Sequence, residues 1–106
     1  MLSKEIIEKG TTLEDVHTTG YAWNYVDCLN VIQELETQGI PILGGDVLRK
    51  NKNNKLEYTY DNWHTNRIDT ESEDEYLSKC YETTKKYIMA YSDKSNTIYF
   101  SLAYKR

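Results

Sequence analysis

The sequence predicts an α+β fold: a small, mostly antiparallel three-stranded sheet with two long amphipathic helices packed on one face, plus a short N-terminal helix. Residues 21–38 and 72–91 each repeat apolar side chains every three or four positions, the period of a helix with one buried face. Short strand-like segments bounded by turn residues lie between and after them. If both helices pack on the same face of the sheet, the apolar face of each helix is buried.

The first 41 residues are predicted to be helical apart from one loop. Ser3 can cap a short helix over residues 3–9, and the polar residues 11–19 are expected to be irregular. The second helix spans residues 21–38, and Pro41 prevents its continuation. Its apolar stripe consists of Tyr21, Tyr25, Cys28, Leu29, Ile32 and Leu35. Trp23 lies off this stripe, so it either covers a second surface or is partly exposed.

The middle of the chain is predicted to form a β-hairpin. Residues 47–50 and 56–60 are its strands, and the asparagine-rich residues 51–54 form its turn, because asparagine tolerates left-handed backbone. In the second strand, Leu56, Tyr58 and Tyr60 alternate with Glu57 and Thr59, which indicates a half-buried strand. The segment Gly44-Gly45-Asp46 lets the backbone turn sharply or bulge where it enters the hairpin.

The last third of the chain predicts a helix and a strand. Ser72 and Glu75 have the spacing of a capping box, and the helix that they begin extends to about Tyr91. Residues 97–104 alternate as a final strand. This strand can pair with either strand of the hairpin, and we favour the first.

Length and charge limit the classes of function. The 106 residues fit one domain over residues 1–106, and the chain carries 17 acidic and 13 basic side chains, for a net charge of −4. Phosphate backbones repel such a surface, whereas a basic protein partner is attracted to it, so we expect no nucleic acid partner. Neither a secretion signal nor an apolar run of membrane-spanning length is visible. The expected location is therefore the cytoplasm, with no membrane contact.

The metal-ligating and thiol residues are few. Cys28 and Cys80 both fall on the apolar stripes of predicted helices, which favours buried, reduced thiols, with a disulfide between the helices as the alternative. Together with His17 and His64 they lack the short spacing of zinc ligands, so we expect no metal. The Gly-Gly-Asp segment has neither the GxxxxGK[ST] nor the GxGxxG spacing of phosphate-binding loops, and no cofactor is expected.

One group of residues could support acid–base chemistry. Asp61 and His64 lie beside Trp63, and Asp46 could approach them across the hairpin, so His64 could act as a general base. No serine or cysteine lies in a nucleophile motif, however, and Asp61 is explained more simply as a turn residue. We therefore predict no catalytic residues, and a small enzyme that uses His64 is the least favoured alternative.

A contact surface for a protein partner is suggested by charge and aromatic content. Five carboxylates, here called the acidic cluster, lie within seven residues: Asp69, Glu71, Glu73, Asp74 and Glu75. Acidic residues favour a helix start, but that accounts for only part of them. The predicted partner-binding residues are Asp69, Glu71, Glu73, Asp74, Trp63 and His64. Trp63 fits a core lid as well as a contact platform, and the ten tyrosines fit either an interface or the edge of a small core.

Two short motifs in order resemble a family of bacterial polymorphic-toxin immunity proteins. They are Ile42-Leu43-Gly44-Gly45-Asp46-Val47 and Tyr58-Thr59-Tyr60-Asp61-Asn62-Trp63, and the resemblance covers roughly residues 20–104. It implies tight stoichiometric binding of a cognate toxin, without turnover. An acidic domain suits a basic toxin such as a nuclease. The main alternative is an interaction module or homodimeric scaffold that uses exposed tyrosines and residues 97–104 as an edge strand.

Overall fold

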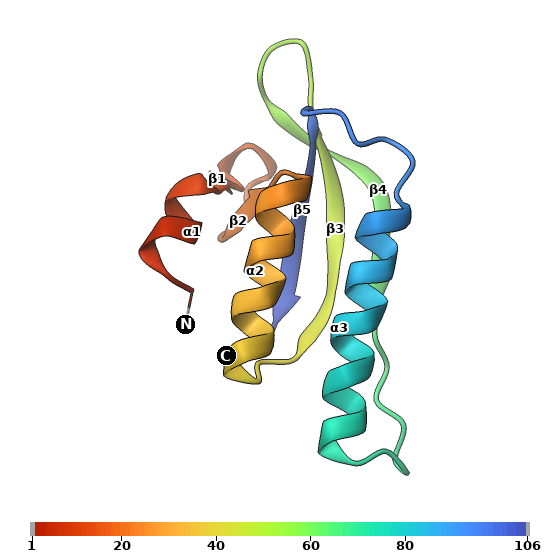
Figure 1. Cartoon of the computed structure of the whole chain (residues 1–106). Coiled ribbons are helices and arrows are strands. Elements are labelled where there is room, and N and C mark those ends of the chain that lie inside the picture. The colour runs from red at the N-terminus through yellow and green to blue at the C-terminus, as the bar shows by residue number, and fades with distance from the viewer. Residues whose placement is uncertain (1, 106) are drawn as a thin grey trace.

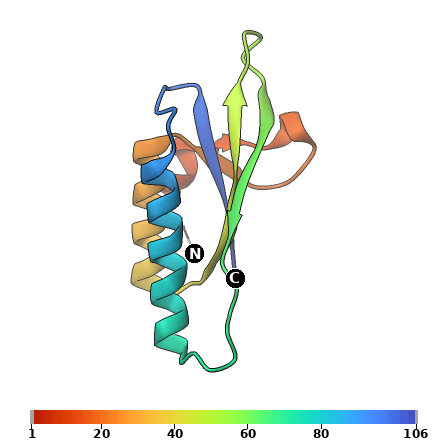
Figure 2. The same cartoon turned by 90° about the vertical axis from the view of Figure 1, so that its right-hand side faces the viewer.

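The computed structural model describes residues 2–105, which form two layers: an antiparallel sheet of five strands, with helices α2 and α3 side by side on one face (Figures 1 and 2). The strand order is β1-β2-β5-β3-β4. In chain order the elements are α1 (Lys4–Lys9), β1 (Thr11–Thr12), the 3-10 turn η1 (Glu14–Val16), β2 (Tyr21–Trp23), α2 (Tyr25–Gln38), β3 (Ile42–Lys50), β4 (Leu56–His64), α3 (Glu73–Ala90) and β5 (Ile98–Tyr104).

The α+β class fits the sequence prediction, but the three-stranded sheet is wrong because the sheet has five strands. The two additional strands, β1 and β2, come from residues that were expected to be loop and helix start. Helix α2 begins at Tyr25 rather than Tyr21, because Asn24 caps it by accepting a hydrogen bond from the Asp27 amide at 2.9 Å. Two or three residues are too short to show alternation, and Tyr21 fits the helical period of Tyr25 by coincidence.

The hairpin is longer than the sequence indicated, with nine residues in each strand. The segment Gly44-Gly45-Asp46 lies inside β3, not before it. The final strand, β5, pairs with the first hairpin strand, β3, on one side and with β2 on the other. Residues 97–104 therefore belong to an inner strand, not to the edge strand considered above, although β2 pairs only with Phe100 and Ser101; the edge strands are β1 and β4.

Trp23 fastens the N-terminal helix to the sheet. Its side chain is buried, and the indole Nε1 donates a hydrogen bond to the carbonyl oxygen of Ile6 at 2.8 Å. Of the two roles left open for Trp23, it therefore covers a second surface, which belongs to α1.

The main core lies between the helices and the sheet, and a smaller one lies on the opposite face. The main core unites the apolar faces of α2 and α3 with side chains such as Val47, Ile98 and Phe100. On the opposite face, Leu13 and Val16 of the η1 segment pack against a patch of the sheet formed by Ala22, Leu48, Leu56 and Tyr99. Figure 2 shows this segment on the side of the sheet away from the helices.

Both cysteines are free thiols in the core, as expected from their position on the helix stripes. Neither Cys28 nor Cys80 is accessible to solvent, and burial, assisted by the negative charge of Asp27, raises the pKa of Cys28 far above its ordinary value. We therefore expect an aromatic disulfide reagent to label neither thiol in the folded protein at pH 8, and both in denaturant. Labelling of the folded protein within minutes would contradict this packing.

Candidate partner-binding surface

The acidic cluster lies where the loop from β4 enters α3, at the bottom of Figures 1 and 2. Two of its carboxylates are held by cations: Glu71 pairs with Lys79 and Glu73 pairs with Arg67, each at 2.8 Å. Hydrogen bonds from Lys79 and from the Ile68 amide lower the pKa of Glu71, so it stays ionised. Glu75 completes the capping box that the sequence predicted.

Two members of the cluster remain available to a partner. Asp69 and Asp74 are both exposed, and neither makes an ion pair or a side-chain hydrogen bond within residues 2–105. The cluster therefore has a structural part, which fixes the loop and the helix start, and a part with free charge.

The two remaining predicted contact residues, Trp63 and His64, lie in different environments. Trp63 is 7% exposed. Its ring stacks on Tyr87 with centroids 4.7 Å apart, and its Nε1 donates a hydrogen bond to the Thr84 hydroxyl at 3.1 Å. Trp63 thus joins β4 to α3 within the core, whereas His64, the next residue, is exposed at the end of β4.

The residues considered for acid–base chemistry are not assembled into a site. The Asp61 carboxylate accepts a hydrogen bond from the Tyr91 hydroxyl at 2.7 Å. Asp46 pairs in register with Asn62, and His64 pairs with Gly44. His64 lines neither the hollow between α1, β2 and β5 nor the hollow beside the acidic cluster. Within residues 2–105, no hydrogen bond therefore gives His64 the carboxylate partner that a general base needs.

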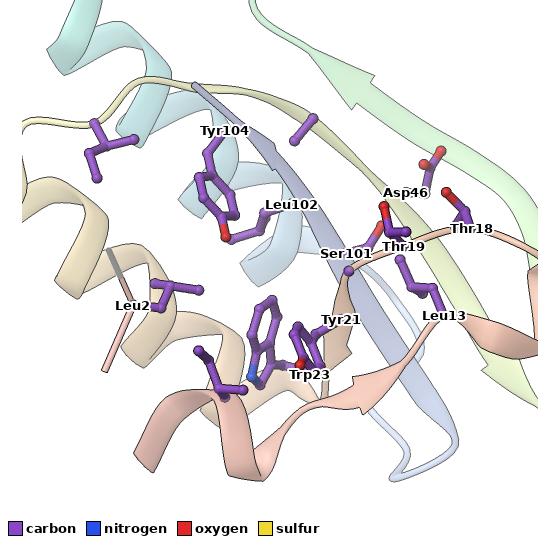
Figure 3. A pocket seen from close by; sticks show the side chains of 14 residues that line it. Leu2, Leu13, Thr18, Thr19, Tyr21, Trp23, Asp46, Ser101, Leu102 and Tyr104 are labelled. Atoms are coloured by element: carbon purple, nitrogen blue, oxygen red, sulfur yellow. The ribbon is translucent and has the colours of Figure 1, made fainter. Parts of the chain in front are cut away.

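The hollow between α1, β2 and β5 has a volume of about 810 Å³. Figure 3 shows Leu2, Trp23 and Tyr104 around one end and Thr18, Asp46 and Ser101 around the other. The indole nitrogen of Trp23 is already bonded to Ile6. Within residues 2–105 no group of three or more His, Cys, Asp or Glu side chains could hold a metal ion, and no helix is long and apolar enough to cross a membrane.

The most unusual backbone of the molecule lies in the edge strand β4. Asp46 pairs with Asn62 and Leu48 with Tyr58, so Val47 alone faces residues 59–61, here called the β4 bulge. At its centre, Tyr60 has a φ of +72° and is 85% exposed. Left-handed backbone at a bulky residue costs on the order of 1–2 kcal/mol.

Side chains hold the β4 bulge on both sides of Tyr60. The Thr59 hydroxyl donates a hydrogen bond to the Val47 carbonyl at 2.9 Å and accepts one from the Asp61 amide at 3.2 Å. The Asn62 side-chain amide donates to the Tyr60 carbonyl at 3.2 Å. Tyr91 of the α3 cap anchors Asp61, and burial, followed by this hydrogen bond, raises the pKa of Tyr91 and keeps its hydroxyl a donor.

Sequence reasoning missed Tyr60 as a candidate site. The alternation of residues 56–60 placed it on the half-buried side of its strand with Leu56 and Tyr58, and that placement is wrong because Leu56 is buried whereas Tyr60 projects into solvent. A bulge depends on the pairing register with β3, and neither strand signals that register locally.

A model of the family described as immunity protein 40 matches residues 12–104. The match begins at the second residue of β1 and ends at the last residue of β5, so it includes β2 to β5 and helices α2 and α3. No curated protein and no solved structure matches the chain.

Proposed function

The chain belongs to the immunity protein 40 family, and we propose from this membership that it binds a cognate bacterial toxin and neutralises it stoichiometrically, without turnover. The observation that carries the proposal is the match over residues 12–104, which spans almost the whole chain. The structure is compatible with inhibition by binding alone, because within residues 2–105 no hydrogen bond or ion pair joins His64 to Asp46 or Asp61.

The chemistry of the proposed partner follows from charge. The net charge of −4 and the free carboxylates of Asp69 and Asp74 favour a basic toxin, such as a nuclease. We place His64 and the acidic cluster in the contact surface, because β4 ends at His64 and residues 65–68 lead directly into the cluster. In this proposal Trp63 acts from the core, where it fixes β4 against α3.

The test is co-expression with the toxin domain encoded beside the gene. We expect growth to be rescued and a one-to-one complex to be recovered on purification. An inactive toxin variant, expressed alone, controls for toxin that is harmless because it is misfolded. If both proteins are folded and neither rescue nor a complex is observed, the proposed function is wrong.

The free charges of the acidic cluster should set the rate of association. We expect Asp69→Asn combined with Asp74→Asn to slow association roughly two- to fivefold at low salt and to weaken its salt dependence, because exposed charges mainly steer encounter. Stability should not change, since neither side chain has a partner within residues 2–105. Stopped-flow association rates at two ionic strengths measure the effect.

The matched control removes the same net charge elsewhere. Glu5 and Glu8 are exposed carboxylates of α1, which does not belong to the proposed contact surface, and Glu5→Gln with Glu8→Gln should change the association rate less. Equal rate changes in the two double variants would mean that only net charge matters and that the acidic cluster is not part of the contact surface. Glu71 and Glu73 are left intact because their ion pairs hold the loop.

A further inference from the structure

The side chain of Tyr60 makes little contact inside the molecule. Its ring contacts the ring of Tyr58 at a centroid distance of 6.4 Å, but most of its surface is in solvent. Within residues 2–105 its hydroxyl has no hydrogen-bond partner. The left-handed backbone opposes folding and the exposed ring gains little from it, which points to a contact outside the chain.

Protection of the sheet edge does not explain the residue. A bulge in an edge strand does interrupt pairing with other molecules. Glycine or asparagine at position 60 would form the same bulge with less strain and without an exposed ring. The bulge can therefore be attributed to edge protection, but the tyrosine cannot.

The surroundings of Tyr60 make it a rigid projection. Hydrogen bonds from Thr59, Asn62 and Tyr91 fix the backbone on either side of it. An aromatic side chain whose backbone is already ordered loses little entropy on binding, and tyrosine is among the residues enriched at the centres of interfaces.

Charge identifies the kind of partner. The nine residues of β4 include two acids, Glu57 and Asp61, on either side of Tyr60 and no lysine or arginine. Both acids are exposed. A tyrosine ring between carboxylates suits a pocket rimmed by lysine or arginine, which can meet the carboxylates as well as the face of the ring.

We propose that Tyr60 is the anchor of the toxin interface: it enters a pocket on the cognate toxin, and Glu57 and Asp61 contact cationic side chains around that pocket. This inference rests on the proposed function and deepens it by assigning the contact to the β4 bulge. It predicts that replacing Tyr60 relieves backbone strain in the free protein and at the same time lowers the affinity for the toxin.

The decisive variant is Tyr60→Asn, which removes the ring and tolerates left-handed backbone. We expect the unfolding midpoint of the free protein to be unchanged or raised by up to about 8 °C. Affinity for the purified toxin domain encoded beside the gene should fall by about thirtyfold or more, the loss typical of an interface anchor. Calorimetric unfolding and titration of the toxin domain measure the two quantities.

Two control variants test whether relief of backbone strain, or loss of exposed apolar surface, is enough by itself to lower the affinity. His17 also has left-handed backbone, with a φ of +58°, so His17→Gly should relieve strain without loss of affinity. Val26 on α2 is 64% exposed, and Val26→Ala removes exposed apolar surface away from β4. Its affinity should also stay within twofold of the original protein.

The outcomes distinguish the inference from the proposed function. If the original protein binds the toxin domain and Tyr60→Asn binds within twofold, the anchor is wrong while neutralisation by binding stands. If the original protein forms no complex, the proposed function fails and the anchor fails with it. An unfolding midpoint well below that of the original protein would show that Tyr60 is stabilised inside the chain, which would also overturn the anchor.

Discussion

Replacing Trp63 by alanine is expected to lower the free energy of unfolding by about 3–5 kcal/mol, the loss typical of a buried tryptophan. The variant would lose the stacking on Tyr87 and the packing of β4 against α3, and the Thr84 hydroxyl, which is fully buried, would lose its donor. Small domains have stabilities of about 5–15 kcal/mol, so the variant should lose a large share of its stability. Urea denaturation followed by far-ultraviolet circular dichroism measures the change.

A graded series tests which part of the indole matters. Trp63→Phe keeps an aromatic ring on Tyr87 but removes the donor to Thr84, so it should cost about 1–3 kcal/mol. Adding Thr84→Val removes the unpaired hydroxyl, and the double variant should be less destabilised than the two single losses together. A Trp63→Ala variant within about 1 kcal/mol of the original protein would contradict the core role.

The same series separates folding from binding at this position. If Trp63 acts only from the core, Trp63→Phe should bind the toxin domain with unchanged affinity at a temperature where it is folded. A loss of affinity in the folded variant would instead favour the direct partner contact that the sequence suggested for Trp63.

The helices were predictable because their signals are local. The apolar stripe of α3 and its capping box at Ser72 and Glu75 lie within the element that they specify, and the structure shows both. By contrast, β2 is three residues long and is held by pairing with β5 and by the bond from Trp23 to Ile6. Those contacts join residues far apart in sequence, so no local pattern could reveal the strand.

On the candidate surface, too, local features were predictable from the sequence, whereas features that depend on contacts between distant residues were not. The five carboxylates of the acidic cluster were visible as charge, but the pairing of Glu71 with Lys79 needs the loop to fold back along α3. The exposure of Tyr60 depends on the register between β3 and β4, which places three residues opposite Val47. The sequence could therefore indicate the acidic cluster but could indicate neither which charges are free nor where β4 bulges.

The residues on which the family resemblance was based form one structural unit. Gly45 pairs with Trp63 across β3 and β4, and the indole lies against the glycine. A methyl group at position 45 would overlap the Trp63 ring on one side and the carbonyl oxygen of Ser101 on β5 on the other. The glycine is thus required by close packing in the centre of the sheet, not by a phosphate or a turn.

Gly45→Ala should therefore cost about 3 kcal/mol or more, near the upper end for overpacking, because one of the overlapping atoms belongs to the backbone of a paired strand and cannot rotate away. Gly39→Ala is the matched control. Gly39 has no atom within 4 Å of the added carbon, so its left-handed φ of +68° alone should cost about 1 kcal/mol. Urea unfolding of the two variants measures the difference, and equal costs would contradict the packing.

A double variant tests whether Gly45 and Trp63 act together. In a Trp63→Ala background the added methyl group at position 45 no longer overlaps the indole ring, so Gly45→Ala should cost less there than in the original protein. An additive result would assign the whole effect to β5 and separate the glycine from the tryptophan. A coupling free energy of about 1 kcal/mol or more would show that Gly45 and Trp63 stabilise the fold through their mutual contact. That contact joins β3 to β4 and, through the indole, to α3.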